Sequence, residues 1–172
     1  MELISEINFG LNSTPIKYSN SIKKNYQRVV SEGFFNYKDQ IYLYSLNEKG
    51  KPGYDVITPF KTNNNENVLV NRGWIEKELK GSSEINKNIK SKKITGLLRK
   101  IYKPNMFKPE NDLKNNIWFS INLNDMEKFT KNKYPNFVIF LENQEIKVPL
   151  PKKITIDVPN NHLKYAITWY SI

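Results

Sequence analysis

The chain has 172 residues, which is the size of one domain with its own hydrophobic core. It contains no cysteine, so a thiolate metal site is excluded and the redox compartment stays open. No run of about 20 apolar residues is present, so no bilayer span is predicted within the chain. The first residues lack the layout of a signal peptide.

The net charge of +10 raises the question of nucleic-acid binding. Only Arg28, Arg72 and Arg99 are arginines, and the remaining positive charge is lysine. Arginine is the residue that reads bases and binds phosphate with two hydrogen bonds. Because the lysines are scattered along the chain, a solvated lysine surface is favoured over a nucleic-acid surface.

Residues 1–25 are polar, include a Ser-Thr-Pro sequence, and are predicted to form an extended lead-in. Strand composition then recurs six times, at residues 26–35, 40–46, 54–60, 68–75, 92–102 and 136–143. Gly33 is predicted to mark a bulge in the first of these strands. The turn-rich residues 47–53 predict that the second and third strands pair antiparallel. Residues 76–88 are polar and are predicted to hold a short helical turn.

Two helices are predicted in the second half of the chain. Leu123, Met126 and Phe129 are spaced three apart, with Asn122 or Asn124 as a cap, which predicts a short helix over residues 122–131. The prolines of residues 148–159 predict an extended segment. A terminal helix then follows over residues 160–172, capped by Asn160 or Asn161. The chain is therefore expected to be one mainly β (α+β) domain, an antiparallel sandwich or small barrel of about six strands.

His162 is the only histidine in the chain. On the terminal helix it shares one face with Tyr165, Ala166 and Trp169, at spacings of three, four and seven residues. The small alanine beside two flat rings would leave room for haem, whose iron often takes a histidine ligand. The alternative is structural, with the imidazole bonded to the loop that enters the helix. Near a helix N-terminus the dipole favours the neutral imidazole, which is the form that binds iron.

The Asn-Arg-Gly-Trp sequence at residues 71–74 ends a predicted strand. Gly73 is expected to have a positive φ or a close backbone neighbour, and Trp74 is expected to lie in the core. Arg72 could bind a haem propionate or a partner's carboxylate, or it could pair inside the domain with an aspartate or glutamate. No catalytic Ser-His-Asp or Cys-His set and no phosphate-binding glycine loop is present, so the chain is not predicted to be an enzyme.

The segments VLVNRGWI (residues 68–75) and NNHLKYAITWY (residues 160–170) resemble the surfeit-locus-protein-one family of cytochrome c oxidase assembly factors. Further segments follow in that family's order: YQRVVSEGFF, which contains Gly33, GYDVITPF, which contains Pro59, then ITGLLRK and the Asn116-x-Trp118 element. The resemblance covers residues 26–169. One departure occurs after Trp118, where the family has a charged pair with an aspartate and this chain has FSINLND, with Asp125 later.

The resemblance implies an inner-membrane protein with this domain on the outer (periplasmic or intermembrane-space) face. One membrane helix would precede the domain, and a second would begin at residues 160–172. It implies a role in haem a handling. The implied partners are the haem-bearing oxidase subunit and haem a synthase, and nucleic acid is not among them. The candidate cofactor-binding residues are His162, which would bind the haem iron, Tyr165, Trp169 and Arg72. The structural-motif residues are Asn160, Asn161, Gly73, Trp74, Gly33 and Pro59. The full-length protein could bind haem a, and none is expected in this chain alone.

Two other functions stay open from the sequence. One is a pure scaffold that holds the oxidase subunit without touching haem. The other is a basic β-barrel that binds single-stranded nucleic acid, which would need exposed stacking aromatics and a strong salt dependence.

Overall fold

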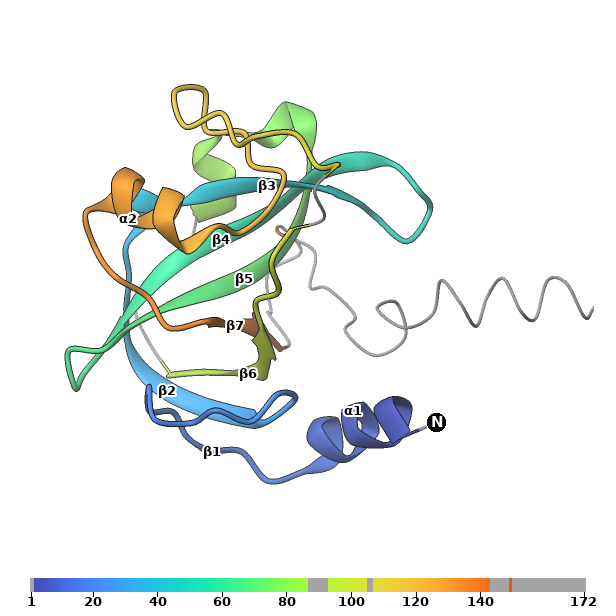
Figure 1. Cartoon of the computed structure of the whole chain (residues 1–172), viewed down its shortest axis with the longest axis vertical. Helices are drawn as coiled ribbons and strands as arrows, with labels where there is room; N and C mark the ends of the chain where they lie inside the picture. The colour runs from blue at the N-terminus through green and yellow to red at the C-terminus, as the bar shows by residue number, and fades with distance from the viewer. Residues whose placement is uncertain (1, 87–92, 105–106, 143–148, 150–172) are drawn as a thin grey trace, which may run out of the picture.

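The computed structural model describes residues 2–86, 93–104, 107–142 and 149 (Figure 1). In chain order the elements are α1 (Glu2–Asn12), β1 (Ile16–Lys17), β2 (Arg28–Phe35), η1 (Tyr37–Asp39), β3 (Ile41–Leu46), β4 (Pro52–Thr62), β5 (Asn67–Glu76), η2 (Lys77–Leu79), η3 (Ser83–Asn86), β6 (Lys93–Lys100), α2 (Leu123–Thr130) and β7 (Phe137–Leu141). The six strands predicted from the sequence are confirmed, and β1 is an additional strand of two residues. The predicted helical turn is present as the short 3-10 helices η2 and η3.

A closed five-stranded barrel forms the centre of the molecule. Strands β2, β6, β7, β5 and β4 follow one another around it, and pairing of β2 with β4 closes the ring. β3 continues the sheet outward from β4, and β1 lies beside β2. The predicted fold class is confirmed, but the sheet is mixed, because β5 pairs parallel with β7 and β1 pairs parallel with β2. A parallel pair needs a long crossover, and the whole segment from η2 through α2 provides it between β5 and β7.

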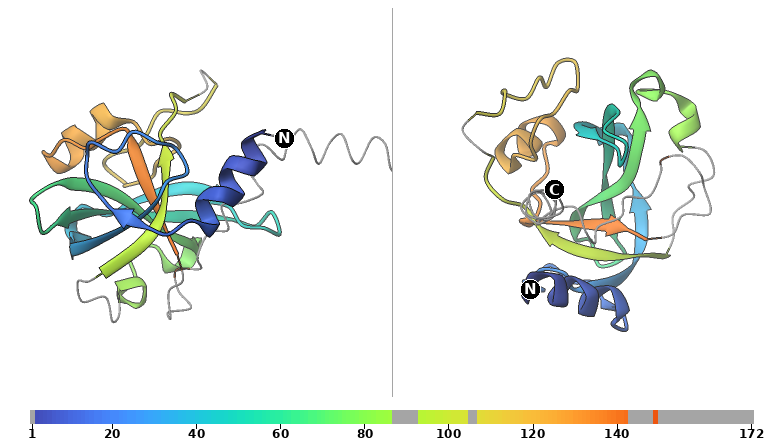
Figure 2. Two further views of the ribbon diagram at one scale, coloured as in Figure 1. Left: turned by 90° about the horizontal axis from the view of Figure 1, so that it is seen from below. Right: turned by 90° about the vertical axis from the view of Figure 1, so that its right-hand side faces the viewer.

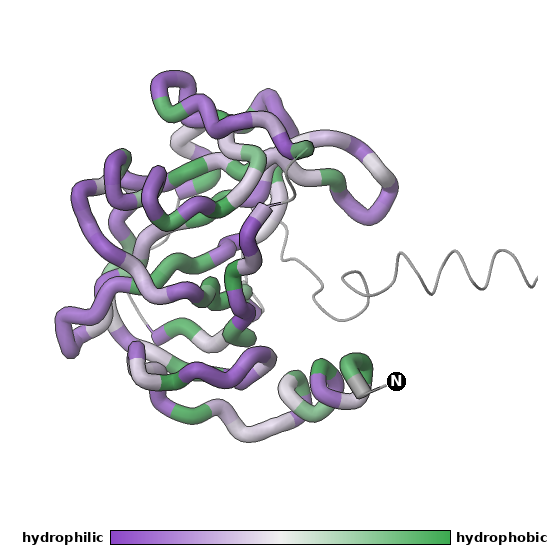
Figure 3. Tube along the Cα trace, in the orientation of Figure 1, coloured by the Kyte–Doolittle hydropathy of each residue, from purple (hydrophilic) through white to green (hydrophobic). Residues whose placement is uncertain are grey.

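The apolar core follows from the alternation of side chains along the strands. Val68 and Val70 join a cluster to which all five barrel strands contribute, so this cluster fills the barrel interior. Leu69, between them, faces outward and packs in a second cluster with Trp118 and Met126, beneath α2. Figure 3 shows this pattern as hydrophobic residues along the strands and hydrophilic residues in the loops.

The prediction of an extended lead-in over residues 1–25 is wrong for its first half, which forms helix α1. Leu3, Ile7 and Leu11 recur every four residues, which places them on one face of a helix. Ile7 is fully buried in a cluster beneath α1, and Leu3 and Leu11 pack against the same cluster. Figure 2 shows α1 and α2 on different sides of the barrel. The helix therefore forms because the barrel gives its apolar stripe a surface to cover.

The helix predicted over residues 122–131 is confirmed as α2. Of the two candidate caps, Asn122 is the one used: its Oδ1 accepts hydrogen bonds from the backbone N–H groups of Asn124 (2.9 Å) and Asp125 (3.2 Å). Lys131, with a φ of 63°, ends the helix in the left-handed conformation. Both ends of α2 are thus fixed by local backbone chemistry.

Gly33 begins the part of β2 that pairs with β4, and the close approach of the two strands explains the glycine better than the predicted bulge. The pairing of Gly33, Phe34 and Phe35 with β4 runs without a break in register. A Cβ atom on Gly33 would lie 2.1 Å from the carbonyl oxygen of Lys61. The close approach of the β4 backbone therefore requires glycine at this position.

Pro59 lies where one edge of β4 changes partners. On this edge, β4 pairs with β3 as far as Ile57 and with β2 from Phe60 onward. The carbonyl of Pro59 accepts a hydrogen bond from the Asn36 N–H across this edge (2.8 Å). The nitrogen and carbonyl of a strand residue point to the same edge, so an N–H at position 59 would face the carbonyl of Asn36. That carbonyl instead accepts a hydrogen bond from the N–H of Asp39 (3.3 Å), so it has a donor although proline provides none.

Gly73 forms part of a β-bulge in β5. Asp55 of β4 pairs with Trp74 and Ile57 pairs with Asn71, so two residues of β5 stand opposite one residue of β4. Gly73 has a φ of 122°, and its N–H donates to Oδ1 of Asn71 at 2.9 Å. The predicted positive φ is confirmed, and the bulge is the reason for it.

We expect Gly73→Val to lower the free energy of unfolding by about 1–3 kcal/mol, because a β-branched residue is strained at a positive φ. Chemical denaturation of the purified chain measures this. Thr95→Val, at a regular and half-buried position of β6, is the control and should change stability by no more than about 0.5 kcal/mol. Equal effects of the two substitutions would contradict the argument from backbone strain.

Candidate functional site

Five of the sequence-predicted site residues lie outside the described residues: Asn160, Asn161, His162, Tyr165 and Trp169. Their helix, their shared face and their role toward haem stay predictions. The extended segment predicted over residues 148–159 also stays a prediction, because Pro149 is its one described residue. None of the helices in the described part of the chain has the length and apolar character needed to cross a bilayer.

Arg72 lies inside the domain with none of its surface exposed to solvent. Its guanidinium donates hydrogen bonds to Oε1 of Gln40 (2.7 Å), Oδ1 of Asn86 (3.1 Å) and the carbonyl oxygen of Ile85. All three acceptors are neutral. Burial lowers the pKa of Arg72 to about 10, so the side chain remains charged at neutral pH.

The aromatic rings of Phe35 and Tyr37 complete the surroundings of Arg72, with ring centres 5.6 Å and 5.2 Å from its guanidinium carbon. The prediction that Arg72 binds a haem propionate or a partner's carboxylate does not fit this position, because an external ligand cannot reach the side chain. Its hydrogen bonds instead join the barrel to η3, which contains Ile85 and Asn86.

The Asn116-x-Trp118 element attaches a long loop to the same region. The side-chain N–H of Asn116 donates to the backbone carbonyl of Gln40 (2.8 Å), and Oδ1 of Asn116 accepts from Nε1 of Trp118 (2.9 Å). Trp118 is completely buried, and its backbone bonds to β3 through Tyr42 (2.9 Å) and Tyr44 (2.7 Å). The motif is therefore a structural clamp on the outer edge of β3. The spacing of the two residues in the sequence does not predict this role.

The segment after Trp118, where the chain departs from the family pattern, is organised by Asn111. Its Oδ1 accepts from the N–H groups of Phe119 (2.8 Å) and Ser120 (3.2 Å), and its Nδ2 donates to Oδ2 of Asp125 (3.0 Å). Asp125 is thus a structural residue that links this segment to the first turn of α2.

Trp74 is confirmed as a core residue. It is 5% exposed, and its Nε1 donates to the carbonyl oxygen of Ser45 at 3.1 Å, across the β3–β4–β5 face.

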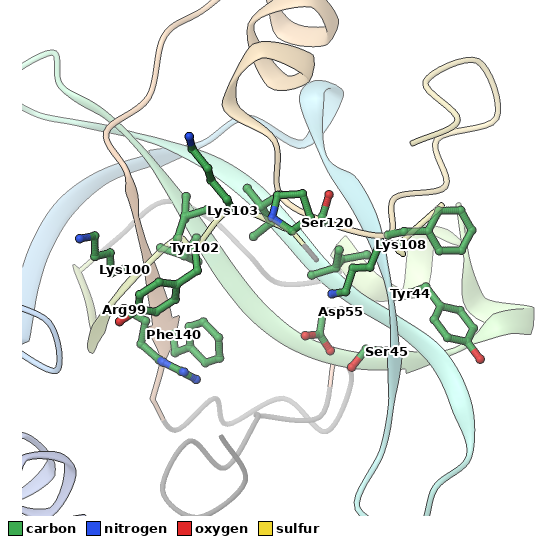
Figure 4. A pocket seen from close by; sticks show the side chains of 16 residues that line it. Tyr44, Ser45, Asp55, Arg99, Lys100, Tyr102, Lys103, Lys108, Ser120 and Phe140 are labelled. Atoms are coloured by element: carbon green, nitrogen blue, oxygen red, sulfur yellow. The ribbon is translucent and has the colours of Figure 1, made fainter. Parts of the chain in front are cut away.

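A pocket of about 550 Å³ opens beside β3, β7 and the segment that follows β6. Its apolar lining includes Leu43, Ile121, Val138 and Phe140, which extend from the cluster beneath α2 to the surface. Its volume lies within the range of small-ligand and side-chain sites in proteins. Figure 4 shows Arg99, Tyr102 and Phe140 on one side of this pocket and Tyr44 and Asp55 on the other.

Four cationic side chains also line the pocket: Arg99, Lys100, Lys103 and Lys108. The guanidinium carbon of Arg99 lies 5.0 Å from the ring centre of Phe140 and 5.7 Å from that of Tyr26, and burial lowers the pKa of Arg99. Asp55 is the one carboxylate in the lining; it is buried and accepts from Nδ2 of Asn71 at 3.1 Å. Four cations against one carboxylate make the lining basic. This site was missed because its residues come from separate segments.

The described part of the chain is thus a closed mixed barrel with an open, apolar and basic pocket. Within its described residues no group of three histidine, cysteine, aspartate or glutamate side chains is placed to hold a metal ion. The model of the SURF1 family matches residues 1–172, and the chain belongs to that family.

The chain is similar to several SURF1-family proteins. It is 33% identical to the SURF1-like protein of Rickettsia conorii over 154 residues, which is 86% of this chain and 64% of that protein. It is 27% identical over 195 residues to Surfeit locus protein 1 of Gallus gallus, covering 100% of this chain and 63% of the relative. For Surfeit locus protein 1 of Arabidopsis thaliana the identity is 25% over 228 residues, covering 94% and 64%. The chain thus spans less than two thirds of the length of these relatives.

Proposed function

We propose that this chain is the globular part of an assembly factor for cytochrome c oxidase, which assists insertion of haem a or stabilises the haem-bearing subunit. The observation that carries the proposal is the SURF1-family match over residues 1–172. The protein would act at the outer face of the inner membrane, anchored by helices that flank this domain. Its partners would be the oxidase subunit that receives haem a, and haem a synthase.

The proposed role is not enzymatic. The chain has one histidine, outside the described residues, and no cysteine. The described barrel therefore lacks histidine, the most frequent general base, and cysteine, one of the common nucleophiles. Its buried polar residues around Arg72 are engaged in holding segments together, which supports a scaffold for binding.

The described residues contain no histidine or cysteine, and Met126 is fully buried in the core beneath α2, so the most frequent haem-iron ligands are not offered by this part of the chain. The proposal therefore assigns iron binding to His162 alone, with Tyr165 and Trp169 beside the ring and Asn160 and Asn161 as helix caps. Arg72 is left out of the haem site because of its burial.

The arginines support leaving nucleic acids out of the proposal. Arg72 is buried. Arg28 forms a bidentate ion pair with Glu142, in which Nε and Nη2 each donate to a carboxylate oxygen at 2.9 Å. Arg99 lies against aromatic rings at the pocket. Each of the three is already engaged within the domain, and base recognition usually depends on arginine.

Titration of the full-length, membrane-embedded protein with haem a tests the proposal. We expect His162→Ala to weaken binding at least tenfold, or about 1.4 kcal/mol, while Lys164→Ala, two residues along the predicted helix and off its proposed face, binds as the wild type does. The chain of 172 residues alone should show no sharp Soret band, because the apolar haem would need the membrane helices as its second wall.

Two results would change the assignment. If the wild type fails to bind haem a but still copurifies with the oxidase subunit, the protein is a scaffold without a haem site. If both variants bind haem a equally well, His162 is not the iron ligand.

A further inference from the structure

We infer that the basic pocket beside β3 is a docking site for an acidic segment of a partner polypeptide that carries an exposed aromatic or aliphatic side chain. The inference goes beyond the proposed function, because it depends on the described pocket and not on haem or His162.

The apolar part of the pocket provides the first step. Leu43, Ile121 and Phe140 are only partly buried, although they pack against the cluster beneath α2. Apolar surface that remains open to water beside a core is stabilised when another apolar group covers it, by roughly 25 cal/mol per Å². The volume of about 550 Å³ is large enough for an inserted side chain.

The charges of the lining give the second step. The ion pairs found between side chains of the described residues are Arg28–Glu142 and Lys51–Glu76, and neither involves the pocket. In that part of the chain no carboxylate forms an ion pair with Arg99, Lys103 or Lys108, and the buried Asp55 is the one carboxylate in the lining. The lining therefore keeps a net positive charge. Complementarity of charge selects a partner whose groups at the pocket mouth are acidic.

The surface around the pocket favours a polypeptide over a small molecule. Tyr44 is 42% exposed and Leu46 is 53% exposed on β3, and Tyr102 is 63% exposed on the segment after β6. Lys77 lies over the ring of Tyr44, with Nζ 5.8 Å from the ring centre, and so adds positive charge beside β3. Tyr44 and Tyr102 thus line the pocket on opposite sides, and apolar and cationic groups continue beyond it past Tyr44, which suits an extended segment that crosses it.

The test is fluorescence anisotropy of the full chain with a dye-labelled peptide of sequence Asp-Glu-Phe-Glu-Asp. We expect saturable binding that weakens as salt is added. The double variant Lys103→Glu with Lys108→Glu should lower the affinity at least tenfold. Lys17→Glu with Lys61→Glu, which changes the net charge equally at exposed positions outside the pocket lining, should lower it less than twofold.

Matched peptides test the apolar part. A peptide with alanine in place of phenylalanine should bind several-fold more weakly, and a Lys-Lys-Phe-Lys-Lys peptide should not bind. Circular dichroism confirms that the variants are folded, and the four lysines are exposed, so folding should be unaffected.

Three outcomes would overturn the inference. The acidic peptide does not bind; the two double variants lose affinity equally, which indicates that binding depends only on the net charge of the chain; or the alanine peptide binds as well as the phenylalanine peptide.

Vesicles with 30% phosphatidylglycerol provide a further arm. Vesicle binding that depends on Lys103 and Lys108, without peptide binding, would assign this surface to a membrane instead.

Discussion

Arg72→Met is expected to lower the free energy of unfolding by about 2–5 kcal/mol, because it removes the guanidinium and its hydrogen bonds from the interior of the domain. The variant removes the donor to Oδ1 of Asn86 and to the carbonyl of Ile85, and it leaves Oε1 of Gln40 with the hydroxyl of Thr58 (2.6 Å) as its remaining donor. Hydrogen bonds to charged groups contribute about 1.5–3 kcal/mol each, and buried acceptors that lose their donor are costly. A loss of this size is a large part of the stability of a typical domain, which is about 5–15 kcal/mol.

Two further variants show whether the loss of stability comes from the missing charge or from the missing hydrogen bonds. Arg72→Lys keeps the positive charge, but one ammonium group cannot reproduce the planar fork that reaches three acceptors, so only part of the stability should return. Arg28→Met removes an ion pair at the edge of the barrel, where both side chains are partly exposed, and should cost no more than about 1 kcal/mol. Urea denaturation at neutral pH measures all three. If Arg72→Met costs no more than Arg28→Met, Arg72 does not hold the barrel to η3.

The strands and α2 could be predicted because their signals are local. The cap at Asn122 and the positive φ at Gly73 follow from residue types whose backbone chemistry is decided by near neighbours. Helix α1 was missed, although Leu3, Ile7 and Leu11 carry a helical spacing. Its polar residues and the Ser-Thr-Pro sequence after it suggested an extended segment, and the surface that α1 covers comes from distant parts of the chain.

The site could be predicted only in part, because its geometry depends on long-range pairing. The Asn-Arg-Gly-Trp sequence does not reveal on which side of the sheet Arg72 lies, since its hydrogen-bond partners come from two other segments, at residues 40 and 85–86. The pocket depends likewise on the parallel pairing of β5 with β7 and on the attachment of the long loop to β3. Neither contact leaves a periodic pattern in the sequence.

Trp118→Ala is expected to lower the free energy of unfolding by about 3–5 kcal/mol, as large-to-small substitutions in a core do. Trp118 is completely buried, and its ring packs edge-on against Phe129, with ring centres 5.7 Å apart. The indole also supplies the hydrogen bond to Asn116, which in turn bonds to the backbone of Gln40. Removal of the ring should therefore leave a cavity beneath α2 and release the Asn116 clamp at once. Hydrogen exchange should then show faster exchange at the amides of Tyr44 and Trp118, which pair β3 with the loop.

Trp118→Phe distinguishes packing from hydrogen bonding, because it keeps an aromatic ring against Phe129 and removes only the Nε1 donor and the second ring. We expect a smaller loss, with the hydrogen bond itself contributing about 1 kcal/mol. Asn116→Ala should then cost less in the Trp118→Phe background than in the wild type, since the shared bond is already lost and only the bond to Gln40 remains to be removed, whereas two independent sites would be additive. Phe34→Ala is the control for size alone: Phe34 is 64% exposed on β2, and its loss should change stability by no more than about 0.5 kcal/mol. If Trp118→Ala behaves as Phe34→Ala does, the long loop is held to β3 by its backbone hydrogen bonds alone, and the tryptophan is not the anchor.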